Sequence, residues 1–159
     1  MSRLTKLLLL LTVAVGLAVP AALADNPHFI SGPTCSGSLA ASGTLSCDGK
    51  VAGLGNVAGL AAVVKIVGTV TCSNNGGSNP PGQQTFTAGP ITVSNGQITF
   101  SGAGGSASCQ GRGITGSFTA ANFFIFIGVG CDLIAHGPNK GQPNSNCTLV
   151  LGPVAATFV

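Results

Sequence analysis

Apolar and polar positions alternate in short runs along this chain, and alternation with a period of two is typical of β-strands. Between residues 63 and 72, one face of the expected strand is apolar and consists of Val64, Ile66, Val70 and Cys72, while the opposite face carries Lys65, Thr69 and Thr71. This segment is therefore predicted to be a half-buried strand. The stretch NFFIFIGVG, residues 122–130, is apolar on both faces and predicts a central strand that is covered on both sides.

The dipeptide Asn95-Gly96 separates two further alternating runs, residues 91–94 and 97–100. Asn-Gly suits the two positive φ angles of a type I′ turn, so the two runs are predicted to form a tight hairpin. The second run then presents two faces, Ile98 with Phe100 and Thr99 with Ser101.

The stretch CSGSLAASGTLSC predicts another hairpin, because antiparallel pairing centred on Ala41 sets Cys35 opposite Cys47. Directly opposed residues have Cα atoms about 4.5–5.5 Å apart, which is within reach of a disulfide. We therefore predict a Cys35–Cys47 bridge. The same register places Gly37 opposite Leu45 and Leu39 opposite Gly43.

Strand-forming residues dominate the rest of the chain, in runs broken by Gly, Pro and Asn, and no long helical periodicity interrupts them. With CTLVL and VAATFV closing the chain, we expect about seven to ten short strands. The predicted fold is an all-β, disulfide-stapled antiparallel β-sandwich, either Ig-like or barrel-like.

The N-terminus has the pattern of a secretion signal. Arg3 and Lys6 precede an apolar run over residues 7–19, and Ala22-Leu23-Ala24 forms a small-residue cleavage site. The run ends at Pro20 and is shorter than the ~20 residues that a membrane-spanning helix needs. We expect residues 1–24 to be a cleaved signal peptide and residues 25–159 a single secreted, extracellular β domain without a membrane span.

All six cysteines lie in the expected mature part, and an even count in an exported chain indicates disulfides. Six cysteines allow about 15 connectivities. A zinc site is disfavoured, because no C-x-x-C pair occurs and an oxidising compartment favours the bridge over the thiolate. The cysteines are Cys35, Cys47, Cys72, Cys109, Cys131 and Cys147.

Few charges remain after the leader. Four basic residues stand against three acidic ones, which gives 4 − 3 = +1. Nucleic-acid binding needs clustered Lys and Arg, so that class of partner is excluded. The charged residues are Lys50, Lys65, Arg112 and Lys140 on one side and Asp25, Asp48 and Asp132 on the other.

The stretch KVAGLGNVAGLAAVV places Gly53, Gly55 and Ala58 at the spacing of a dinucleotide-binding fingerprint. That site requires a preceding buried strand, a following helix and an acidic residue about 20 positions later. Residues 70–80 contain no Asp or Glu, and the following segment alternates as a strand. We therefore expect no cofactor here, only a turn that links two strands.

Two polar loops are candidate binding surfaces, since loops on rigid scaffolds commonly carry function. One covers residues 73–83 and the other residues 132–146, which Cys131 and Cys147 bracket. A Cys131–Cys147 bridge would stabilise the fold by roughly 3 kcal/mol. The candidate binding residues are Asn74, Asn75, Asn79, Asp132, His136 and Lys140.

The pieces NPHFISGPTC, LSCDGKVAGLGNV and CSNNGGSNPPGQ occur in this order and spacing between Asn26 and Cys109. Together they resemble a family of small secreted actinobacterial proteins that has no assigned biochemical function. The resemblance implies a Cys72–Cys109 disulfide. Beyond Cys109 the chain departs from the pattern, so the strand at residues 123–127 and the loop at residues 131–147 are particular to this protein.

Catalytic chemistry has few candidates: two histidines, His28 and His136, and the three aspartates. An Asp132–His136 pair is conceivable, but a solvent-exposed loop histidine explains it more simply. No G-x-S-x-G elbow occurs, and no two carboxylates form an evident pair. The Trp and Tyr platforms usual in sugar sites are also absent. We expect a non-enzymatic protein without a metal or cofactor.

Two functions fit these observations. The first is an extracellular binding or interaction domain, whose partner is an extracellular protein, a surface or an apolar small molecule. A carrier of such a molecule in a Phe-lined cleft would be similar in outline to the secreted β-sandwich apoproteins that hold enediyne antibiotics. The second is a structural cell-surface protein that self-associates through apolar strands.

Overall fold

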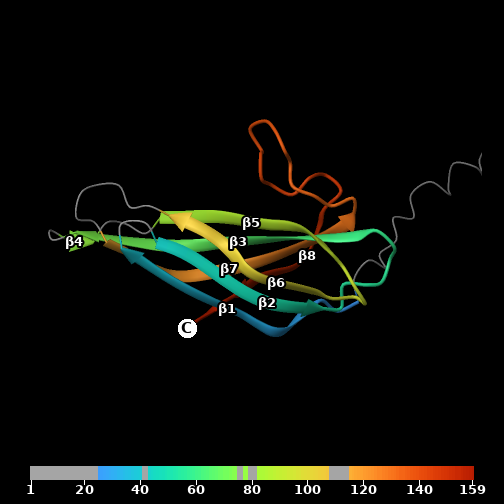
Figure 1. Ribbon diagram of the computed structural model, residues 1–159, viewed down its shortest axis with the longest axis horizontal. Coiled ribbons are helices and arrows are strands. Elements are labelled where there is room, and N and C mark those ends of the chain that lie inside the picture. Colours follow the sequence, from blue (N-terminus) through green and yellow to red (C-terminus); the bar gives the residue numbers. More distant parts are fainter. Residues whose placement is uncertain (1–24, 41–42, 75–76, 79–81, 108–114) are drawn as a thin grey trace, which may run out of the picture.

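The computed structural model of the chain describes residues 25–40, 43–74, 77–78, 82–107 and 115–159, and this part consists of nine β-strands without a helix (Figure 1). No helix that could cross a membrane occurs within these ranges. The all-β prediction is confirmed. The strands are β1 (His28–Ala40), β2 (Gly43–Ala52), β3 (Leu60–Asn74), β4 (Gly77–Ser78), β5 (Gly82–Thr92), β6 (Ile98–Ala107), β7 (Thr115–Val129), β8 (Thr148–Ala155) and β9 (Thr157–Phe158).

The strands form two sheets that pack face to face. Sheet A has the order β9-β1-β2-β6, and sheet B has the order β5-β3-β7-β8 with β4 also paired to β3. The end of β1 also pairs with the start of β7, where Leu39 lies opposite Gly116, so the sheets are continuous at that corner. The predicted β-sandwich is confirmed, with a barrel-like junction. Its longest strands, β3 and β7, have 15 residues each and exceed the short strands expected.

The core lies between the two sheets and follows the predicted alternation. β7 runs between β3 and β8 as a central strand, and its inward residues are fully buried. The ring of Phe100 stacks on that of Phe123 with centroids 5.7 Å apart, and Phe29 meets both edge-on. These aromatic contacts fill the interior at one level of the sandwich. The largest buried side chains include Leu45, Val51, Leu54, Leu60, Val64, Ile66, Phe123, Ile125 and Ile127.

The Asn95-Gly96 turn is confirmed, with φ angles of 50° and 69°. Ser94 and Gln97 exchange two backbone hydrogen bonds of 2.9 and 3.0 Å across it. The tight hairpin predicted beyond this pair is wrong, because β5 continues along β3 while β6 continues along β2. The turn therefore carries the chain from one sheet to the other. Each strand buries its apolar face better against the sandwich core than a two-stranded ribbon would allow.

Two predicted disulfides are confirmed. Cys35 lies directly opposite Cys47 with Cα atoms 4.1 Å apart, and Cys131 is bonded to Cys147. Gly37 pairs with Leu45 as predicted, whereas Leu39 lies beside β7. Cys72 is also disulfide-bonded, and its expected partner Cys109 lies outside the described residues. These bridges fit an oxidising, extracellular environment.

The glycine-rich segment between β2 and β3 is a turn, as predicted. Gly53, Gly55 and Gly59 all have positive φ angles, between 75° and 80°. A Cβ atom on Gly53 would collide with the carbonyl oxygens of Asp25 and Asn26, so the close approach of the N-terminal segment requires glycine here. The turn leads into strand β3 rather than a helix, and the geometry of a dinucleotide site is missing.

The polar segment at residues 73–83 is not the continuous loop that was expected. β3 extends to Asn74, β4 pairs with its end, and β5 begins at Gly82. The reason is tertiary, because β7 pairs with this end of β3, with Cys72 opposite Gly116 and Ser73 opposite Thr115, and the ladder extends the strand into the polar segment. Asn74 is thus the last residue of a strand, and Asn75 and Asn79 lie outside the described residues.

Candidate functional site

The segment that joins β7 to β8, residues 130–147, forms a loop closed at its base by the Cys131–Cys147 disulfide. We call residues 132–146 the stapled loop. Two glycines permit its sharp exit from β7. Gly130 has a φ angle of 71°, and a Cβ atom on Gly128 would collide with the Asn146 carbonyl oxygen. The chain therefore turns back on itself directly after the strand, which brings the two cysteines together.

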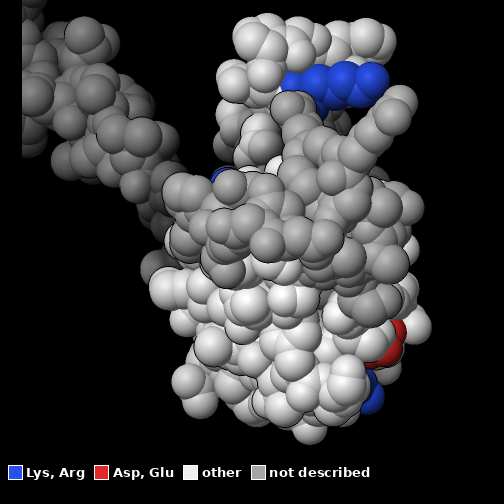
Figure 2. Space-filling model, turned by 90° about the vertical axis from the view of Figure 1, so that its left-hand side faces the viewer, with Lys and Arg blue, Asp and Glu red and all other residues white. Residues whose placement is uncertain are grey.

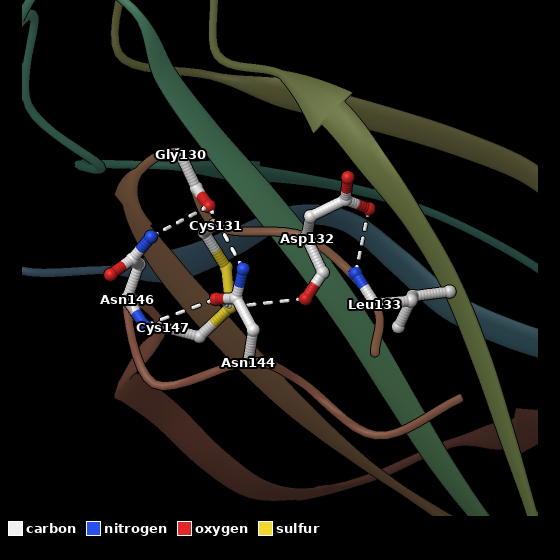
Figure 3. The surroundings of a disulfide bond; sticks show 7 residues. All are labelled: Gly130, Cys131, Asp132, Leu133, Asn144, Asn146 and Cys147. Carbon is white, nitrogen blue, oxygen red and sulfur yellow. Dashed lines mark hydrogen bonds between the residues drawn. A yellow bond between two sulfur atoms is a disulfide. The ribbon is translucent and has the colours of Figure 1, made fainter. Parts of the chain in front are cut away.

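Two asparagine amides lock the base of the stapled loop (Figure 3). The Asn144 and Asn146 side-chain amides both donate to the Gly130 carbonyl, at 3.0 and 3.3 Å. The Asn144 side-chain oxygen in turn accepts the Asn146 backbone N–H at 3.0 Å. The backbone N–H of Asn144 donates to the Asp132 carbonyl at 2.9 Å. The disulfide is thus embedded in a hydrogen-bonded frame that fixes where the loop leaves the sandwich.

Above the base, the two arms of the loop pair with each other. Ile134 donates to the Gln142 carbonyl and Gly141 donates to the Ile134 carbonyl, both at 2.8 Å. Lys140 donates to the Gly137 carbonyl at 3.1 Å and closes the turn at the far end. Residues 135–140 are all exposed. We call these residues the tip, and the paired arms below hold it in a defined shape.

The stapled loop is also tied to sheet B at a distance from its base. The Thr87 hydroxyl of β5 donates to the Gly141 carbonyl at 2.7 Å. On the outer face of β3, Val63 is completely buried although it does not belong to the core between the sheets. The outer face is therefore covered at this level, where the loop spans from β7 to β5. Figure 1 shows the loop rising from the end of β7 and extending past β5.

The predicted loop residues have different roles in this geometry. One carboxylate oxygen of Asp132 accepts the Leu133 N–H at 2.6 Å, so this side chain supports the base. No hydrogen bond or ion pair joins Asp132 to His136 in the described part of the chain, and both side chains are exposed. His136 and Lys140 both belong to the tip. Both are exposed surface groups, and no Asp–His pair is formed within the described residues.

The tip carries a positive charge and no negative one. It offers the Lys140 ammonium, the His136 imidazole and the Asn139 amide, and residues 133–146 contain no carboxylate. The imidazole and the amide can both donate and accept hydrogen bonds, while the ammonium only donates, so the charge of the tip favours a partner that presents acceptors or negative charge. Elsewhere, charged side chains are sparse, as the described part of one side of the molecule shows (Figure 2).

Sequence reasoning missed three residues of this site. The amides of Asn144 and Asn146 hold the base, and the Asn-rich run before Cys147 was a signal that could have indicated them. Thr87 had no signal, because it is 54 residues from the carbonyl that it binds.

No family model, curated protein or solved structure matches this chain.

Proposed function

We propose that this protein is a secreted, non-enzymatic binding domain that presents the tip of the stapled loop to an acidic partner on an extracellular protein or cell surface. The observation that carries the proposal is the difference between the base and the tip of the stapled loop. Its base is fixed by a disulfide and two asparagine amides, while every residue of its tip is exposed.

Ordering a surface segment is costly, roughly 1–2 kcal/mol of backbone entropy for each residue fixed. The tip residues add nothing to the core between the sheets. A binding role explains the ordered arms, since a loop that is already shaped loses less entropy when a partner binds. The cleavable leader pattern and the disulfides support export.

The absence of an Asp132–His136 contact supports a binding role over catalysis. A general base needs a partner within hydrogen-bond reach to orient it, and the side-chain hydrogen bond that Asp132 makes is with the Leu133 N–H and not with His136. The tip therefore supplies recognition groups without an assembled nucleophile.

A retention assay on washed cells of the producing organism tests the proposal. The variant His136→Ala/Lys140→Ala removes one imidazole and one ammonium from the tip. The matched control His28→Ala/Lys65→Ala removes the same two groups from β1 of sheet A and β3 of sheet B. We expect the tip variant to lose at least about fivefold in apparent affinity and the control to bind like the wild-type protein.

Equal retention of all three proteins, or loss only in the control, would contradict the proposal. Sedimentation of the wild-type protein over a wide concentration range tests the alternative. A monomer throughout supports the binding domain, and a growing series of oligomers supports self-association at the cell surface.

A further inference from the structure

Sheet A carries a second feature, on its outer face and in a different sheet from the stapled loop. Strands β1, β2 and β6 all leave regular pairing at the same level. In β1, Gly32-Pro33 is inserted between Ser31 and Thr34, whose partners on β2 are Lys50 and Asp48. Between β2 and β6 the register shifts again at Asp48. Bulges redirect side chains and are common beside binding sites.

A pocket of about 330 Å³ opens at these irregularities. It belongs to the lower part of the range of small-molecule sites, roughly 300–1,000 Å³. Its lining residues carry one carboxylate, one ammonium and four hydroxyl groups. The lining residues are Ser31, Thr34, Asp48, Gly49, Lys50, Thr99, Phe100 and Ser101.

The Asp48 carboxylate is held in place by β6. The Gly102 N–H donates to it at 2.9 Å, and the Ser101 hydroxyl forms a second hydrogen bond. The hydrogen bond with the Ser101 hydroxyl is the larger cause that lowers the pKa of Asp48 below its ordinary value of 3.8. The hydrogen bond from the Gly102 N–H lowers this pKa further. No ion pair joins Asp48 to Lys50 within the described residues. The pocket therefore presents a fixed acceptor and a separate donor, whose charges cancel overall.

The Phe100 side chain lies beneath the pocket, on the core side of sheet A. Gly49 has no side chain, and a Cβ atom there would lie 2.6 Å from Cζ of Phe100. The Phe100 ring is 5% exposed and stacks on Phe123 in the core, and it packs directly under the backbone of β2. Glycine is required at this position for the ring to come so close.

We propose that this pocket binds a neutral saccharide. A sugar carries hydroxyl groups that donate to Asp48 and accept from Lys50, and the hydroxyls of Ser31, Thr34 and Thr99 can serve either role. A neutral ligand matches a site whose two charges cancel, whereas an anion or a cation would meet one repulsive group. This site is independent of the stapled loop.

An amide-resolved NMR titration of the protein with glucose, galactose, mannose and N-acetylglucosamine tests the proposal. We expect at least one sugar to cause saturable shifts at residues 48–50 and 99–102, with a dissociation constant below about 10 mM. Asp48→Asn and Lys50→Gln should each weaken that binding about tenfold or more. The tip variant His136→Ala/Lys140→Ala is the control and should bind the sugar unchanged.

Two variants are used because Asp48 accepts hydrogen bonds from β6, so Asp48→Asn changes the β6 bulge as well as the pocket. Lys50 does not support the bulge, so Lys50→Gln tests its role in binding alone. Absence of saturable shifts with every sugar would overturn the proposal. So would binding that survives in the Lys50→Gln variant, or saturable shifts with acetate or glycine but with no sugar.

Discussion

The loss of unfolding free energy on removal of the Cys131–Cys147 bridge can be calculated from the length of the stapled loop. The bridge closes a loop with a sequence separation of 16. On the chain-entropy argument, a closed loop of this length stabilises the native state by about 3 kcal/mol at 25 °C. We therefore expect Cys131→Ala/Cys147→Ala to lose about 3 kcal/mol of unfolding free energy. For a domain of this size, the unfolding midpoint should fall by roughly 10 °C.

The Cys35–Cys47 bridge provides the comparison. Its sequence separation is 12, so the entropy contribution is again about 3 kcal/mol. Both of its cysteines are buried in the core, at 1 and 0% exposure, while Cys147 is only half-buried. Truncation of two core side chains leaves a cavity, and we expect Cys35→Ala/Cys47→Ala to lose about 1–2 kcal/mol more than the loop variant.

Urea unfolding and calorimetry without reductant would measure both variants. A loss below about 1 kcal/mol in the loop variant would refute the reasoning, because the asparagine contacts to Gly130 would then hold the loop without the bridge. A larger loss in the loop variant than in the core variant would refute the comparison.

Three further predictions follow from burial and charge. In stepwise reduction with alkylation and mass spectrometry, Cys131–Cys147 should open before Cys35–Cys47, because Cys147 is reachable by solvent and both core cysteines are not; the reverse order would contradict the assigned burial. Phe123→Ala should cost about 3–5 kcal/mol in urea unfolding, since Phe123 is fully buried, whereas its neighbour Phe124 is half-buried on the outer face and Phe124→Ala should cost about 1–2 kcal/mol. Equal losses would mean that the two faces of β7 are packed alike. The lowered pKa of Asp48 means that its hydrogen bonds stabilise the fold above about pH 3.8 and that this contribution is lost as the pH falls below that value. The difference in unfolding midpoint between the wild-type protein and Asp48→Asn should therefore shrink from neutral pH to about pH 2, and a difference that stays constant would contradict the assignment.

Features set by neighbouring residues could be predicted from the sequence. The two faces of β3 follow from simple alternation, the Asn95-Gly96 turn from the φ preferences of two residues, and the Cys35–Cys47 bridge from hairpin geometry. In each case the partners are close in the chain, so local chemistry decides the structure.

Features set by distant residues could not be predicted. β5 and β6 diverge because β5 pairs with β3 and β6 pairs with β2. No residue at the turn indicates either of these partners. The Thr87 anchor of the stapled loop and the bulges around Asp48 likewise arise from pairing between separate segments. The stapled loop was expected from the two cysteines that bracket it, whereas its Thr87 anchor and the pocket around Asp48 could be located only once the sheets were in place.

Site-directed photo-crosslinking on intact cells tests the central claim, that the tip of the stapled loop makes the contact with the partner. A benzoylphenylalanine replaces Pro138 in the tip in one variant and the exposed Ser106 of β6 in the other. We expect a covalent adduct with a cell-surface component from position 138 and none from position 106. Adducts from position 106 alone, or from neither position, would contradict it.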